Sequence, residues 1–279
     1  TMARYVEEGA QVTLVTCTLG EMGEVLVPEL AHLAADQDDA LGPHRRTELA
    51  DAMAHLGVTD YRFLGGPGHF RDSGMKWGDD GNATAADDIH ENAFWHADLL
   101  EAANFMVEII REVRPQVLVT YDEFGNYGHP DHVQAHRVAT YGAALAAARS
   151  YRHDLGEAWD VPKIYWTAMS ATALRQGIQE VREAGDLSFM EGMDPDNLPP
   201  FAIDDDDLDA VIDGSAWVDR KMDAMRAHAT QITVDGPFFA LSNDIAQRAW
   251  GQEFYRLVKG VAAPAPGSRF EDDLFAGTD

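Results

Sequence analysis

The sequence predicts an α/β fold, with helices covering both faces of a mostly parallel sheet. Short apolar runs rich in β-branched residues alternate with longer segments whose apolar residues recur at helical spacing. The chain has 279 residues, a length that one elaborated α/β domain can accommodate. Polar, glycine-bearing segments follow the strands, at the edge where such folds bind ligands. We therefore expect a single domain with a C-terminal elaboration.

Strands are expected in four apolar runs, at 11–17, 59–66, 116–122 and 161–170. Helices are expected just before Gly9, then at 29–56 with a break near Gly42, and at 92–115, 132–150, 171–183, 216–231 and 242–260. The last residues, 262–279, have no such pattern. We expect them to form a loosely ordered tail after a domain that spans 1–261.

The charge of the chain argues against two classes of partner. It contains 48 acidic and 21 basic residues, for a formal net charge of −27, which repels nucleic acid and anionic membrane surfaces. No apolar run reaches the length of about 18 residues that a membrane-spanning helix needs. The only cysteine, Cys17, fits a reducing cytoplasm. We expect a small-molecule ligand and predict no oligomeric state.

Three polar loops follow the first three expected strands: "TLGEMGE" at 18–24, "GGPGHFRDSGM" at 65–75 and "DEFGNYGHPDH" at 122–132. The carboxyl ends of parallel strands meet at one edge of a sheet, and ligands bind there. The three loops are therefore expected to converge on a functional site.

The third loop contains the motif "YGHPDH" at 127–132. Pro130 biases His129 toward an extended backbone, so a helix can begin near His132. Two histidines flanking Asp131 could divide into a metal ligand and a proton carrier, with the carboxylate orienting a ring. A polar helix start that caps itself and binds no metal is the alternative that spacing alone leaves open.

The other loops offer further polar side chains. Asp72 could accept hydrogen bonds from substrate hydroxyls, or it could belong to an ordinary Asp-Ser-Gly turn. Glu21 and Glu24 could line a site or be solvated. Arg45 could bind a hydroxyl or phosphate group, or form a surface ion pair. The motifs of a serine-hydrolase elbow, a P-loop and a dinucleotide fingerprint are absent from the sequence.

Taken together, the motifs resemble those of the LmbE-like, or PIG-L, family of zinc-dependent N-deacetylases, and most closely its mycothiol-pathway branch, which acts on N-acetylglucosaminyl-inositol. The markers occur in order along nearly the whole chain: "GAQVTLVTCTLGEMGEV", "HRRTELADAMAHLGV", "LGGPGHFRDSGM", "RPQVLVTYD", "YGHPDHVQAH", "VPKIYWT" and "RAHATQ". The resemblance implies a Rossmann-like fold and one divalent metal, usually Zn²⁺ with Fe²⁺ as the alternative. The metal-bound water would attack the acetamide carbonyl.

The resemblance also implies roles for individual residues. His132 would bind the zinc, and Asp131 would be its neighbour behind the ligand. His129 would stabilise the oxyanion or protonate the leaving amine, and Tyr127 would donate to the same oxyanion. The substrate-binding residues would be Arg45, Asp72, Met75, Glu24 and Gln231.

One part of the family pattern is missing from the sequence. The family's remaining zinc ligands, a histidine and an aspartate, and its aspartate base belong to an "HPDDE" motif, which does not occur here. Since a catalytic zinc takes three protein ligands, we expect this motif in a segment that precedes Thr1. The alternatives to the deacetylase are an amidase that cleaves mycothiol S-conjugates and a catalytically silent sugar-binding protein.

Overall fold

The computed structural model describes residues 1–79, 81–183, 194–232 and 251–278. The chain forms two compact units, each assembled from separate stretches of sequence. Unit 1 contains Thr1–Arg62, Met169–Asp205 and Asp213–Glu253, and unit 2 contains Phe63–Ala168, Asp206–Ile212 and Phe254–Asp279.

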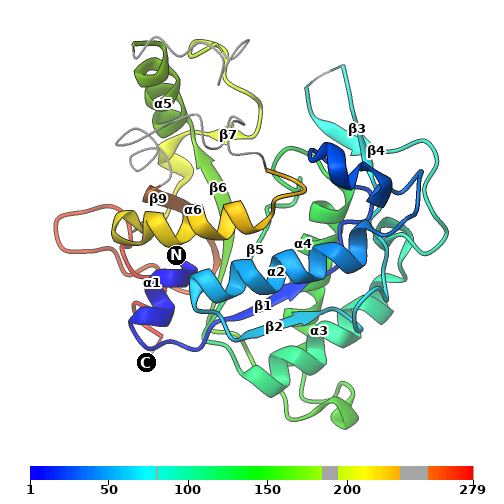
Figure 1. The fold of residues 1–279 in the computed structure, drawn as a ribbon. Coiled ribbons are helices and arrows are strands. Elements are labelled where there is room, and N and C mark those ends of the chain that lie inside the picture. The colour runs from blue at the N-terminus through cyan, green and yellow to red at the C-terminus, as the bar shows by residue number, and fades with distance from the viewer. Residues whose placement is uncertain (80, 184–193, 233–250, 279) are drawn as a thin grey trace. The chain divides into compact units, whose positions relative to one another are not determined.

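Unit 1 is built around helices and a two-stranded sheet (Figure 1). Its elements are α1 (Met2–Glu7), β1 (Thr13–Thr16), the 3-10 helix η1 (Pro28–Leu33), α2 (Leu41–Leu56), β2 (Asp60–Phe63), α5 (Ala171–Glu183), β7 (Ala202–Ile203), η5 (Ser215–Trp217) and α6 (Val218–Ala227). Helix α2 packs against α6, and β1 pairs with β2. Buried Ala52, Met53 and Leu56 of α2 meet Ala3 and Ala224 in the core of this unit.

Glycines end the first helices of unit 1. Gly57 has a φ of 77° and follows the last residue of α2, so its left-handed backbone closes the helix. Gly9 has a φ of 93°, and its N–H donates to the Val6 carbonyl just after α1. The helix expected before Gly9 is therefore present.

Unit 2 contains most of a larger sheet with strand order β5-β6-β9-β8. Its elements are β3 (Met75–Trp77), β4 (Ala83–Ala85), η2 (Phe94–His96), α3 (Leu99–Val113), β5 (Val117–Thr120), α4 (Pro130–Ala147), η3 (His153–Leu155), β6 (Lys163–Ser170), η4 (Asp205–Asp207), β8 (Ala210–Asp213) and β9 (Gln252–Lys259). Strands β5 and β6 are parallel, whereas β6 and β9 are antiparallel. The last two residues of β6 pair in parallel with β7.

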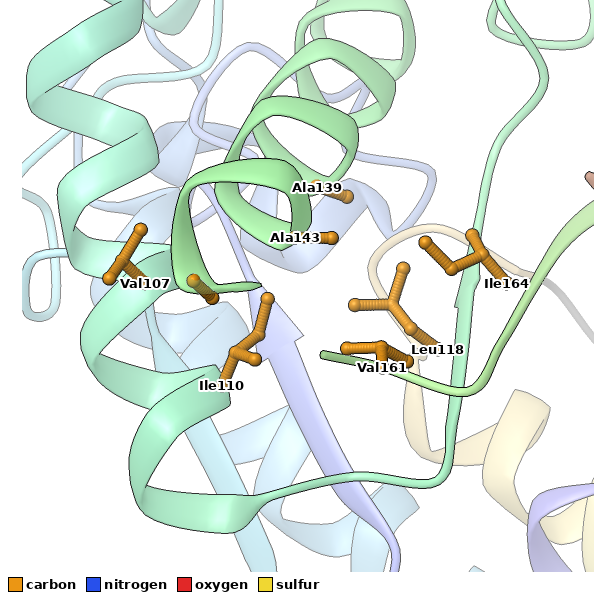
Figure 2. Packing of buried hydrophobic residues seen from close by; sticks show 8 residues of the cluster. Val107, Ile110, Leu118, Ala139, Ala143, Val161 and Ile164 are labelled. Atoms are coloured by element: carbon orange, nitrogen blue, oxygen red, sulfur yellow. The ribbon is translucent and has the colours of Figure 1, made fainter. Parts of the chain in front are cut away.

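The core of unit 2 lies between two helices and the β5–β6 pair. Asp98 is the N-cap of helix α3, and its carboxylate accepts from the backbone N–H groups of Leu100 and Glu101. Figure 2 shows side chains of α3, α4, β5 and β6 gathered in one cluster. The cluster consists of Val107, Ile110, Leu118, Ala139, Ala143, Ala146, Val161 and Ile164. The alanines of α4 let it approach α3 closely.

The α/β class is confirmed, and a strand lies within each of the four expected ranges. The described pairings are both parallel and antiparallel, so the sheet is mixed. The helix expected at 242–260 is wrong where it can be compared, because Gln252–Lys259 is strand β9. Antiparallel pairing with β6 overrides its local helical spacing. Residues 242–250 lie outside the described residues.

The C-terminal segment was expected to be a loosely ordered tail over 262–279. Glu271 and Leu274 are completely or almost completely buried in unit 2, so these two residues attach the segment to that unit. In the described ranges, none of the helices combines the length and hydrophobicity that a membrane span requires.

Candidate active site

The start of α4 positions the two histidines of the "YGHPDH" motif. Pro130 occupies the first turn, where no backbone N–H is needed, and His129 is the N-cap. The Nδ1 atom of His129 accepts a 3.1 Å hydrogen bond from the Asp131 N–H. Burial lowers the pKa of His129, against the charge of Asp72, which raises it. In the neutral ring Nδ1 is the acceptor, so Nε2 carries the proton and can donate a hydrogen bond.

His132 lies one turn further, with its ring stacked on Tyr121 at a centroid distance of 4.1 Å and an interplanar angle of 5°. Its Nδ1 is 3.3 Å from the Gly125 carbonyl oxygen, which can only accept, so Nδ1 holds the proton in the neutral ring. Burial and the neighbouring His129 lower the pKa of His132 to about 4. The ring is therefore neutral near pH 7, with the Nε2 lone pair available as a ligand.

Asp131 is buried beside Ser73 of the preceding loop. The Ser73 N–H donates to one carboxylate oxygen at 3.0 Å, and the Ser73 hydroxyl donates to the other. The same hydroxyl oxygen accepts from the Trp95 N–H at 2.9 Å. Burial, followed by the charge of Asp72, raises the pKa of Asp131 to about 7, although the Ser73 hydrogen bonds oppose this shift. Asp131 thus ties the start of α4 to the 65–75 loop.

Tyr127 faces both histidines edge-on, with its ring centroid 5.1 Å from that of His132 and 6.2 Å from that of His129. Burial and the charge of Asp72 raise the pKa of Tyr127, so its hydroxyl is a neutral donor at pH 7. The ring of Trp77 lies 5.9 Å away on the β3–β4 hairpin. The aromatic ring of Tyr127 therefore lies between the hairpin and the imidazoles.

Backbone contacts with β4 hold the Tyr127 segment in place. The Ala83 N–H donates to the Tyr127 carbonyl at 2.7 Å. The next residue, Gly128, has a φ of 96°, and a Cβ built there would lie 2.4 Å from the Ala83 carbonyl oxygen. Glycine is required at this position for both reasons.

Asp72 and Met75 belong to the loop that supplies Ser73. Asp72 accepts from the Gly74 N–H at 2.8 Å, so it does form the turn weighed from the sequence. Its charge also acts on the ionisation of Tyr127, His129, Asp131 and His132. Met75 is the first residue of β3, in register with Ala85. The structure thus brings Asp72 together with the four residues predicted around the chemistry.

The other three predicted substrate residues lie in unit 1. Arg45 on α2 donates from Nη1 to the Gly20 carbonyl at 3.0 Å. Gln231 donates from Nε2 to the Glu24 carbonyl at 2.9 Å. Arg45 and Gln231 therefore both hydrogen-bond to the polar loop after β1, which the sequence marked at 18–24 and which contains Glu24.

Sequence reasoning underestimated Ser73 and Glu48, and it expected different contacts for Asp131. Ser73 was weighed only as part of a turn, although its position beside Asp72 was a signal. Glu48 was not singled out, because its partner Thr230 lies 182 residues further along the chain. Asp131 was expected behind the metal-binding histidine, yet its hydrogen bonds run to Ser73, and the Nδ1 of His132 faces Gly125.

A catalytic zinc takes three protein ligands, and the donor set can be tested for that requirement. The neutral ring of His132, oriented through its Nδ1, has the chemistry of one ligand. Within the described part of the chain, however, no three His, Cys, Asp or Glu side chains are arranged to hold a metal ion. The described residues therefore do not complete a zinc site.

The model of the PIG-L family, GlcNAc-PI de-N-acetylase, matches residues 1–143. A protein of Nocardioides sp. is 66% identical over 278 residues, covering 99% of this chain and 92% of the relative. The chain belongs to the PIG-L family. A second member, from Kribbella flavida, is 68% identical over 278 residues, covering 99% of this chain and 91% of the relative. Both relatives are named 1D-myo-inositol 2-acetamido-2-deoxy-alpha-D-glucopyranoside deacetylase.

A solved structure shares the fold of this PIG-L chain. The N,N'-diacetylchitobiose deacetylase from Pyrococcus horikoshii aligns with a TM-score of 0.58 at 15% identity, covering 96% of this chain and 80% of that one. At this identity the likeness extends to the fold alone. The family resemblance drawn from the ordered motifs is therefore confirmed by the PIG-L match and by the close relatives.

Proposed function

We propose that the chain is a metal-dependent hydrolase that removes the N-acetyl group from N-acetylglucosaminyl-inositol in mycothiol biosynthesis. The names of relatives that are 66% and 68% identical across nearly the whole chain support this substrate. The observation that carries the chemistry is the grouping of two neutral histidines, a tyrosine and a buried aspartate at the start of α4. Under this proposal the binding partner is a small amino-sugar substrate.

The described side chains suit an amide hydrolysis that develops negative charge on the acetyl oxygen. The Nε2–H of His129 and the hydroxyl of Tyr127 are neutral donors that can stabilise this oxyanion. The alternative role, protonation of the leaving amine, would require His129 as the imidazolium, because a neutral ring that gave up its Nε2 proton would become an imidazolate. Asp131 accepts hydrogen bonds from the N–H and the hydroxyl of Ser73, and it thereby holds the start of α4 against the 65–75 loop.

The proposed metal is Zn²⁺, with Fe²⁺ as the alternative and His132 as one ligand. Metal analysis of the full-length protein tests this assignment. Wild type is expected to hold about one zinc per chain, and His132→Ala is expected to lose it. His153→Ala, in which an exposed histidine is removed, is the matched control and should keep the metal. Zinc retained in His132→Ala would remove His132 from the ligand set.

The substrate is tested by measuring acetate release from N-acetylglucosaminyl-inositol beside cleavage of a bimane conjugate of mycothiol. Faster acetate release supports the deacetylase. Faster conjugate cleavage would instead identify an amidase, and sugar binding with neither reaction would identify a silent binding protein. A cytoplasmic location, suggested by the single cysteine, and the absence of nucleic-acid and membrane partners stay predictions.

A further inference from the structure

The 20–26 loop of unit 1 carries Glu24, one of the predicted substrate residues. The Nε2 of Gln231 donates to the Glu24 carbonyl at 2.9 Å. Two residues later, the Leu26 N–H donates to the Thr230 carbonyl at 2.8 Å. One backbone bond and one side-chain bond therefore connect this loop to the turn that follows α6.

The buried carboxylate of Glu48 on α2 holds the turn that follows α6. Thr230 is fully buried and Glu48 is 5% exposed. The Thr230 N–H donates to one oxygen of Glu48 at 2.8 Å, and the Thr230 hydroxyl donates to the other, also at 2.8 Å. Hydrogen bonds to an ionised group are stronger than those between neutral groups, and a buried carboxylate is costly without them. Thr230 therefore cannot shift without breaking both of its hydrogen bonds to this buried carboxylate.

Helix α2 also reaches the opposite end of the loop. Arg45 lies three residues before Glu48, a spacing that places both on one face of the helix. The Nη1 of Arg45 donates to the Gly20 carbonyl at 3.0 Å. The loop is thus held at Gly20 by Arg45, at Leu26 by Thr230 and, through the residue next to Thr230, at Glu24 by Gln231.

We propose that Glu48 is a positioning residue, which acts through Thr230 to place Gln231 and the 20–26 loop for substrate binding. The inference rests on the proposed function, in which Glu24 and Gln231 bind the amino sugar. Because Glu48 hydrogen-bonds to the turn and the loop groups bind substrate, its loss is expected to change KM and to leave kcat nearly unaltered.

Kinetics of the full-length enzyme test the role of the carboxylate. Glu48→Ala is expected to raise KM about tenfold, the effect of losing a hydrogen bond to a charged group, with kcat within about twofold. Glu48→Gln should restore most of the affinity, because its amide can accept from the Thr230 N–H and donate to the hydroxyl. A fall in kcat at unchanged KM would overturn the inference.

A double-mutant cycle with Gln231→Ala tests whether Glu48 acts through that residue. Coupled residues give non-additive effects, so Glu48→Ala/Gln231→Ala is expected to have a KM close to that of Gln231→Ala alone. If the fold-change in KM of the double variant equals the product of the two single fold-changes, Glu48 acts independently of Gln231, contrary to the proposal. If Glu48→Ala does not fold, Thr230→Val, which removes the hydroxyl that donates to Glu48, replaces it in the same double-mutant cycle.

Hydrogen exchange of the free protein separates this inference from the proposed function. Glu48→Ala should accelerate amide exchange in the peptide that covers 20–26, where the Leu26 N–H bonds to Thr230. Lys221→Ala removes an ion pair with Glu253 in the same unit and controls for general destabilisation. Exchange at the wild-type rate in Glu48→Ala, or equal acceleration in Lys221→Ala, would overturn the positioning role, whatever substrate the wild-type protein hydrolyses.

Discussion

Lys163 and Glu271 form an ion pair in unit 2, with side chains 2% and 0% exposed. The Tyr165 hydroxyl donates to the second oxygen of Glu271 at 2.7 Å, and the Ala263 N–H donates to the first, also at 2.7 Å. Every oxygen of this buried carboxylate is thus hydrogen-bonded. The contacts attach the C-terminal segment to strand β6, which carries both Lys163 and Tyr165.

Removing one partner of this pair is expected to destabilise the protein strongly. Glu271→Ala leaves the Lys163 ammonium buried without its counter-charge, at a cost of about 3–5 kcal/mol in the free energy of unfolding. Urea denaturation measures the change. Arg269→Ala breaks an exposed ion pair with Asp206 and should cost less than about 1 kcal/mol. Equal midpoints for the two variants would show that the buried pair contributes nothing particular.

Replacing Ser73 is expected to reduce activity. Ser73→Ala removes the hydroxyl that donates to Asp131 and accepts from the Trp95 N–H. Losing a hydrogen bond to a charged group costs about 1.5–3 kcal/mol, and activity is expected to fall about 10- to 100-fold if this loss displaces the start of α4. Steady-state acetate release measures the effect. Ser268→Ala removes a hydroxyl that caps an exposed turn and should have wild-type activity; a Ser73→Ala enzyme as active as this control would contradict the expectation.

A methyl group at Gly128 is expected to disturb the Tyr127 segment. Gly128 has a φ of 96°, and its added Cβ would meet the Ala83 carbonyl oxygen at 2.4 Å. Gly267, with a φ of 80° and nothing within 4 Å of its Cβ position, is the matched control. Gly267→Ala should therefore show backbone strain alone, about 1–3 kcal/mol, and Gly128→Ala a larger loss in thermal denaturation. The expectation fails if both variants melt together.

The neutral ring of His228 is expected to make unit 1 sensitive to acid. Burial and the charge of Arg45 lower the pKa of His228, against the charge of Glu48. The unfolded chain therefore binds a proton first, starting near its ordinary pKa of 6.5. Stability is then fully present above pH 6.5 and falls as the pH decreases toward the folded pKa.

Unfolding free energies at pH 7.5 and 5.5 test this linkage. His228→Gln should lose less stability between the two pH values than wild type does. His55→Gln, in which an exposed histidine of α2 is replaced, should lose as much as wild type. An unchanged pH dependence in His228→Gln would show that another group causes the acid sensitivity.

Local patterns in the sequence were sufficient for much of the fold and for part of the site. Four apolar runs predicted strands β1, β2, β5 and β6, and the "YGHPDH" motif predicted a helix that begins near His132, where α4 in fact begins at Pro130. Such features depend on backbone preferences over a few residues: β-branched runs favour strands, and Pro130 favours a helix start. The ordered motifs also identified the PIG-L family, which the comparisons confirmed.

Contacts between distant segments account for what the sequence did not reveal. Gln252–Lys259 became strand β9 because β6 offered an antiparallel partner, and Glu271 attaches the C-terminal segment because it meets Lys163, 108 residues away. Ser73 and Glu48 gained their importance from Asp131 and Thr230, at separations of 58 and 182 residues. A buried carboxylate needs donors, and only folding brings together those that lie so far apart along the chain.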